Sequence, residues 1–99
     1  MLDLELVSDE AQLFFDQYVV SGSDDELFAS GYLRGHVDLV LGGALINQQT
    51  LSLDDVISQV ENSVNKAISS GELQQSDVVV VNKVLNSLIV KLSNHAVSQ

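Results

Sequence analysis

The chain has 99 residues, of which 45% are hydrophobic and 18% charged, and it contains no cysteine and no proline. That length fits a single domain over residues 1–99, the hydrophobic fraction is too high for a disordered chain, and the lack of cysteine excludes disulfides, thiolate metal sites and a cysteine nucleophile. Four basic residues against 14 acidic ones give a net charge of −10, which disfavours nucleic acids and anionic membranes as partners and favours basic proteins or metal cations.

Apolar residues recur at helical spacing from the N-terminus and predict a first helix over about residues 3–20. Its main apolar face consists of Leu4, Val7, Ala11, Phe14, Phe15 and Tyr18. A second stripe with a seven-residue spacing consists of Leu6, Leu13 and Val20. We expect a helix with two apolar stripes to pack against two neighbours, or against one neighbour and a partner chain.

A second helix is predicted over about residues 24–46, because Ser23 followed by Glu26 forms a capping box. Its unusual feature is a set of four glycines, which are Gly31, Gly35, Gly42 and Gly43. Each glycine inside a helix costs about 1 kcal/mol relative to alanine, and the sum is large beside a stability of about 5–15 kcal/mol. The first three share one strip of the helical wheel, and the residues that flank this strip are Leu27, Arg34, Asp38 and Leu45.

Two interpretations of the glycine strip remain open. The glycines let a neighbouring helix of the same bundle approach closely, or they form the floor of a shallow outer groove that accepts a partner helix or peptide. Gly42 and Gly43 also fit an end or a kink of the helix. In the groove interpretation, the candidate interaction surface consists of Leu27, Gly31, Arg34, Gly35 and Asp38.

Tyr32 and His36 lie one turn apart on the second helix and form a candidate polar site. A histidine in such an apolar neighbourhood is most often buried and satisfied by a hydroxyl or a carboxylate. Arg34 and Asp38 have the spacing of an i,i+4 ion pair, although Arg34 is also placed to pair with the acidic cluster at residues 24–26.

Two further helices are predicted, over about residues 53–70 and 76–95. Ser52 is the expected cap of the third helix and Gly71 its C′ residue, and either Ser76 or Asp77 is the expected cap of the fourth. The valine run at residues 78–81 would suit a strand, but the later spacing of apolar residues favours a helix. Four helices joined by short linkers predict an all-α, up-down antiparallel four-helix bundle.

The segment from Ser23 to His36, SDDELFASGYLRGH, resembles the signature of the YfcL-like family of small proteobacterial proteins. Gly71-Glu72-Leu73 also occurs where that family tends to have it. The resemblance implies a soluble bacterial helical domain of unknown biochemical function. It supplies no catalytic residues, and it directs attention to the second helix.

No residue pattern indicates catalysis, a cofactor or a metal site. The two histidines, His36 and His95, lie on different predicted helices, and the chain has neither an HExxH motif nor a glycine-rich phosphate-binding motif. The N-terminus lacks the basic region and apolar core of a signal peptide, so we expect a cytoplasmic protein.

The sequence therefore leaves two hypotheses for the function. One is a small acidic protein-interaction module whose partner is another protein, a basic one if electrostatics selects it, or a second copy of the chain. The other is a small-molecule-binding or catalytic protein that uses Tyr32, Arg34 and His36.

Overall fold

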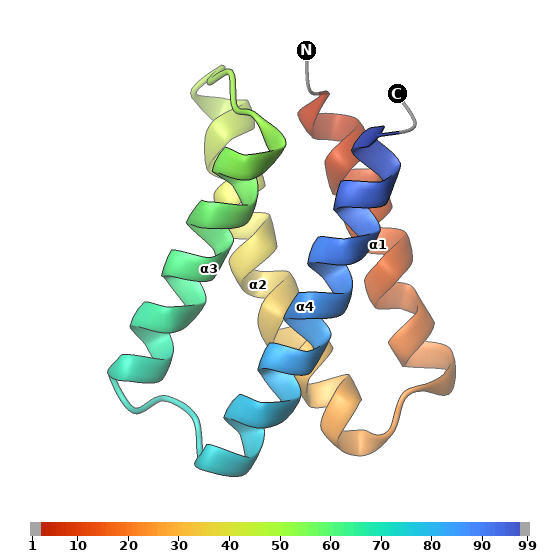
Figure 1. Ribbon diagram of the computed structural model, residues 1–99, viewed down its shortest axis with the longest axis vertical. Coiled ribbons are helices and arrows are strands. Elements are labelled where there is room, and N and C mark those ends of the chain that lie inside the picture. Colours follow the sequence, from red (N-terminus) through yellow and green to blue (C-terminus); the bar gives the residue numbers. More distant parts are fainter. Residues whose placement is uncertain (1–2, 98–99) are drawn as a thin grey trace.

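The structure is a computed structural model that describes residues 3–97, with side chains described as far as Asn94. The described residues form four α-helices and no strand (Figure 1). The helices are α1 (Leu4–Ser21), α2 (Asp24–Ile46), α3 (Leu53–Ser69) and α4 (Gln75–Val97). Consecutive helices run in opposite directions (Figure 1). The predicted all-α up-down bundle is confirmed, and the valine run at residues 78–81 is helical.

Local signals in the sequence set the ends of α2 and α3. Ser23 and Ser52 each form a complete capping box, in which the serine hydroxyl accepts from the backbone N–H of Glu26 or Asp55 and that residue's carboxylate accepts from the serine N–H. Gly71 has a φ of +82°, in the left-handed region that glycine adopts without strain. It follows α3 as the C′ residue that the sequence predicts.

The predicted cap of the fourth helix is wrong. α4 begins at Gln75, because the backbone N–H of Val78 already donates to the carbonyl of Gln74. Ser76 and Asp77 therefore lie inside the first turn of α4 rather than in front of it. The acidic side chain of Asp77 in that turn is favourable beside the positive end of the helix dipole.

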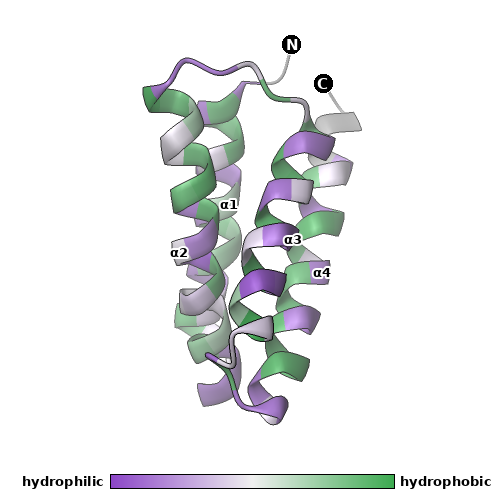
Figure 2. Ribbon diagram, turned by 90° about the vertical axis from the view of Figure 1, so that its left-hand side faces the viewer, coloured by the Kyte–Doolittle hydropathy of each residue, from purple (hydrophilic) through white to green (hydrophobic). Residues whose placement is uncertain are grey.

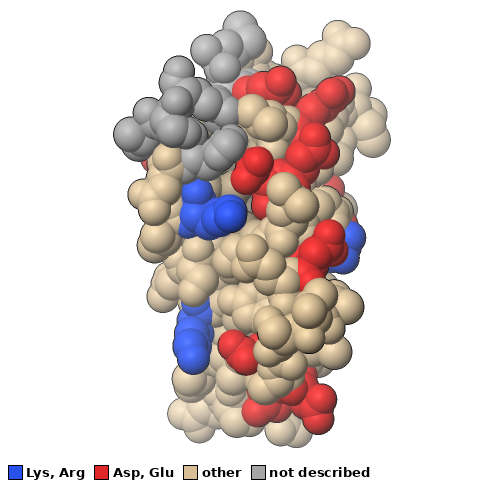
Figure 3. Space-filling view, turned by 90° about the vertical axis from the view of Figure 1, so that its right-hand side faces the viewer, with Lys and Arg blue, Asp and Glu red and all other residues tan. Residues whose placement is uncertain are grey.

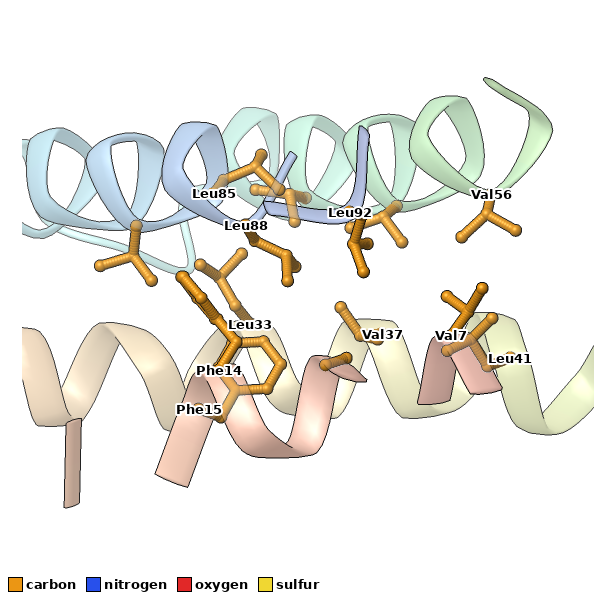
Figure 4. Close-up of a cluster of buried hydrophobic side chains, with 14 of the residues drawn as sticks. Val7, Phe14, Phe15, Leu33, Val37, Leu41, Val56, Leu85, Leu88 and Leu92 are labelled. Carbon is orange, nitrogen blue, oxygen red and sulfur yellow. The ribbon is translucent and has the colours of Figure 1, made fainter. Parts of the chain in front are cut away.

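One hydrophobic core takes side chains from all four helices. Its buried members are Leu4, Val7, Ala11, Phe14, Phe15, Ala29, Leu33, Val37, Leu41, Ala44, Val56, Val60, Val64, Val81, Val84, Leu85, Leu88 and Leu92. Figure 4 shows how these side chains meet, with Leu33 and Leu88 pointing toward one another from opposite sides of the core. Burial of this apolar surface is the main term that stabilises the bundle.

Within this core, α2 has a central position. Like α4, it packs against the three other helices, whereas the backbones of α1 and α3 are not adjacent in the described part of the bundle. The inner side of α2 is therefore fully occupied by neighbouring helices, and only the side that points away from the core is left for solvent or a partner.

α2 continues through Gly42 and Gly43 to Ile46, in agreement with the predicted range of residues 24–46, so these glycines do not end the helix. In the second apolar stripe of α1, Leu13 and Val20 are exposed and Leu6 is half-buried, so the outer part of this stripe does not pack into the bundle. No helix in the described part of the chain is long and apolar enough to cross a membrane.

Candidate interaction surface

The glycines of α2 do not serve close packing inside the bundle. A Cβ atom added at Gly31, Gly35, Gly42 or Gly43 would meet no heavy atom within 4 Å beyond the backbone of α2 itself. A methyl group therefore fits at each position without displacing a neighbouring helix. The interpretation that these glycines let another helix of the same chain approach closely is wrong.

The side of α2 that points away from the core is largely apolar. We define the outer face of α2 as Leu27, Phe28, Gly31, Tyr32, Gly35, Asp38, Leu39, Gly42, Leu45 and Ile46. Phe28 is 50% exposed, Leu39 is 72% exposed and Ile46 is 83% exposed, and Asp38 is the one charged residue of the set. In Figure 2 much of the ribbon of α2 is green or white, whereas α3 beside it presents several purple turns. Exposed apolar side chains gathered on one helix face are typical of an interaction surface.

Arg34 borders the outer face of α2 on the side of α1. Its guanidinium donates a hydrogen bond to Gln12 Oε1, and its Nη1 lies 3.9 Å from the carboxylate of Asp16. The expected pairing of Arg34 with Asp38, or with the acidic cluster at residues 24–26, is therefore wrong. The physical reason is that the side chain reaches across to α1 instead of lying along its own helix.

A small hollow lies beside Arg34 between α1 and α2. It has a volume of about 60 Å³, and its lining includes Val19, Leu27, Gly31 and Arg34. Val19 is 65% exposed and Leu27 is 44% exposed. The buried residues Phe15 and Ser30 also line this hollow. Because Gly31 has no side chain, part of the wall is helix backbone, which a partner side chain can approach closely.

Three rings follow one another along the opposite border of the outer face, on the side of α3. The rings of Phe28 and Tyr32 are stacked with centroids 6.2 Å apart, and the rings of Tyr32 and His36 are 4.8 Å apart. Tyr32, Gly35, His36 and Leu39 line an open hollow of about 180 Å³. The three rings protrude along this border, and the surface is recessed at Gly35, which has no side chain.

Hydrogen bonds to α3 and to the loop that follows it hold the polar side chains of this border. His36 Nδ1 lies 2.6 Å from Ser63 Oγ, and the Tyr32 hydroxyl donates to Glu72 Oε1 at 3.4 Å. Desolvation raises the pKa of the Tyr32 phenol, and the negative charge of Glu72 and its hydrogen bond raise it further. His36 is thus half-buried and paired with a hydroxyl, which is the ordinary structural outcome for such a histidine.

The structure does not bring the alternative polar site together. Tyr32 and His36 line the hollow on the α3 side, while Arg34 lines the hollow on the α1 side. The three side chains therefore cannot contact one small ligand at the same time. Among the described residues no three His, Asp or Glu side chains are grouped to hold a metal ion, and the side chain of His95 lies outside the described residues.

The remaining surface carries most of the charge. Figure 3 shows acidic side chains spread from top to bottom of one side of the molecule, with basic side chains mainly along one edge of that view. α1 contains Glu5, Asp9, Glu10 and Asp16 and no basic residue. The outer face of α2, with Asp38 alone, stands out from this acidic surface as a nearly uncharged strip.

Several residues that organise the borders of the outer face could not be assigned to it from the sequence. Gln12 and Asp16 hold Arg34 from α1, and Ser63 and Glu72 hold the two polar rings. These contacts cross between helices, and their partners are ordinary surface residue types. The one local signal was Gly71-Glu72-Leu73, which the sequence resemblance singled out without assigning it a role.

Comparison with known proteins points to one family. Residues 7–90 match the model of a family described as YfcL protein. The chain is also 41% identical over 78 residues to a protein named "Uncharacterized protein YfcL" from Escherichia coli strain K12, an alignment that covers 79% of this chain and 84% of that protein. No solved structure matches the chain.

Proposed function

The chain belongs to the YfcL family, and we propose that it is a small acidic protein-interaction module of the bacterial cytoplasm, with the outer face of α2 as its contact surface. No activity comes with the family, since the curated relative is named as uncharacterised. The outer face of α2 itself supports this function.

The observation that carries the proposal is that the glycines of α2 face open space. Four glycines lower the helix stability by roughly 4 kcal/mol relative to alanine, and nothing in the bundle needs them, because a Cβ atom at each position meets no neighbour. A partner that approaches the helix backbone closely would account for the missing side chains. Large exposed side chains such as Phe28 and Leu39 lie beside the glycines and would provide the apolar contacts.

A second candidate function is the binding of a small molecule in the hollow of about 180 Å³ beside Tyr32 and His36. The half-exposed rings of Tyr32 and His36 favour small-molecule binding, because they offer a stacking surface and two hydrogen-bonding groups. Arg34 would not contact a small molecule bound there, because it lines the other hollow. Titration of the 15N-labelled protein with a metabolite panel tests it. Shifts of the His36 ring signals would support it, and unchanged signals would remove it.

Site-specific photo-crosslinking in bacterial cells tests the interaction function. A photoreactive amino acid replaces Leu39 on α2, and in a matched control it replaces Asn62, an exposed residue on α3. We expect covalent protein adducts from position 39 and few from position 62. Equal adducts from both positions, or none from position 39, would contradict the proposed function.

A further inference from the structure

We propose that the outer face of α2 binds the same face of a second copy of this chain, with the two α2 helices antiparallel and crossing at Gly35. This inference rests on the proposed function, because it names the occupant of the same surface.

The order of residues along the outer face is complementary to itself when it is reversed. In an antiparallel pair centred on Gly35, the two copies of this glycine meet at the crossing point, where neither has a side chain. Residues four positions after Gly35 then stand level with residues four positions before it. Leu39 of one copy consequently lies beside Phe28 and Tyr32 of the other, and Leu45 lies beside Leu27.

The charges at the edge of the strip fit the same register. Arg34 and Asp38 both lie on the border toward α1, and a two-fold axis through Gly35 brings these borders of the two copies to the same side. Arg34 of one copy then stands within about one helical turn of Asp38 of the other, and the pair occurs twice. To form it, the Arg34 guanidinium would turn from Gln12 and Asp16 of its own α1 toward Asp38 of the second copy. Asp38 makes no ion pair within residues 3–94, so the second copy would supply a partner for a carboxylate on an apolar face.

Charge also selects the antiparallel direction. A parallel pair would place the acidic first turns of α2, residues 24–26, side by side. An antiparallel pair places each of these turns beside the last turn of the other α2, where residues 43–46 carry no charge. The helix dipoles then also run in opposite directions, which is the favourable arrangement.

The size of the strip and the net charge indicate a weak dimer. A helix of 23 residues is about 35 Å long and about 10 Å wide, so its footprint is roughly half of the ~800 Å² that each partner commonly contributes. Each copy also carries a net charge of −10, and the two copies repel one another at low ionic strength. We therefore expect a dimer with a dissociation constant in the micromolar range, which tightens when added salt screens the repulsion.

Sedimentation velocity measures the association of the full chain. Between about 10 µM and about 1 mM we expect the wild type to shift from monomer to dimer, and to do so at lower concentration in about 300 mM than in about 20 mM NaCl. Leu39→Glu should raise the dissociation constant about tenfold or more, because it places a charge against Phe28 and Tyr32 of the other copy. Asn62→Glu adds the same charge to α3 and should leave the dissociation constant unchanged. Leu39 is 72% exposed, so circular dichroism should show that both variants fold.

Disulfide trapping tests the register, because the chain has no cysteine of its own. Under mild oxidation Gly35→Cys should form a cross-linked dimer readily, since Cα atoms must come within about 7 Å. Gly31→Cys should not, because the antiparallel register separates its two copies by about 12 Å along the axis. Both positions accept a Cβ atom without a clash.

Three results would overturn the inference. They are a wild type that stays monomeric at about 1 mM, a Gly31→Cys variant that cross-links as fast as Gly35→Cys, and a dimer that Asn62→Glu weakens as much as Leu39→Glu. The photo-crosslinks at position 39 separate this failure from failure of the proposed function. Adducts of twice the mass of the chain agree with a second copy, whereas adducts of another mass only would keep the interaction function and exclude the dimer.

Discussion

The outward sides of α2 and α3 differ in composition, although both helices pack against the same core. Both helices bury one apolar stripe in the shared core, including Leu33 on α2 and Val64 on α3. The outward side of α3 is polar, and its exposed residues are Asp54, Asp55, Ser58, Gln59, Asn62, Asn65, Lys66 and Ser69. The outward side of α2 instead carries glycines and exposed Phe28, Leu39 and Ile46. Because α3 meets the same packing requirement with a polar outward side, packing within the bundle does not explain the apolar outward side of α2.

The largest effect is expected where the two helices are alike. Leu33 is fully buried, and Leu33→Ala should lower the free energy of unfolding by about 2–5 kcal/mol, through lost burial and a cavity. Val64→Ala should act in the same direction and by less, because fewer atoms are removed. Urea denaturation followed by circular dichroism measures both. A loss below about 1 kcal/mol for Leu33→Ala would show that the inner side of α2 is not packed as described.

Glycine substitutions on α2 and at the end of α3 should change the free energy of unfolding in opposite directions. Gly35→Ala should raise the free energy of unfolding of the monomer by about 1 kcal/mol, because alanine favours the helix and its Cβ meets open space. Gly71→Ala at the end of α3 should lower it by about 1–2 kcal/mol, because its φ of +82° is unfavourable for a residue with a side chain. Thermal unfolding at low protein concentration gives the signs. Destabilisation by Gly35→Ala would mean that the bundle itself needs this glycine.

The hydrogen bond between α2 and α3 should have a smaller effect. Ser63→Ala removes the hydroxyl that pairs with His36 Nδ1 and should cost about 1 kcal/mol of unfolding free energy. Ser58→Ala, at an exposed position on the same helix, is the control and should cost less. The ring signals of His36 in an NMR spectrum should move in the first variant alone. Equal losses from both variants would indicate that the bond does not stabilise the contact between these helices.

The smallest effect concerns the alkaline limit of stability. The pKa of Tyr32 is raised by burial and by Glu72, so the folded protein holds the phenolic proton more tightly than the unfolded chain. The contribution of the Tyr32 phenol to the free energy of unfolding is present below about pH 10. It is lost as the pH rises through the pKa of Tyr32 in the folded protein. Tyr32→Phe should therefore lose less stability than the wild type between about pH 9 and pH 11, as urea midpoints would show. The pKa of Tyr18 is also raised, so part of the wild-type loss should remain.

The fold followed from the sequence because its signals are local. Periodic apolar residues predicted each helix, and serine caps and Gly71 predicted most of the ends, since these patterns act within one or two turns. The partners of Arg34, Tyr32 and His36 did not follow, because Gln12, Glu72 and Ser63 come from other elements and are common surface types. The role of the glycine strip depended on which way the helix is turned in the bundle. A wheel diagram gives the spacing of Gly31 and Gly35, but only the packed structure shows that they point outward.

The most direct test of the contact surface is a series of 1H–15N spectra of the wild type at rising protein concentration. We expect amide signals along the outer face of α2, with Gly31, Gly35 and Leu39 among them, to shift progressively. Signals of Gln59, Asn62 and Lys66 on the outward side of α3 should stay in place. Shifts centred on α3, or no shifts up to about 1 mM, would contradict the proposed contact surface.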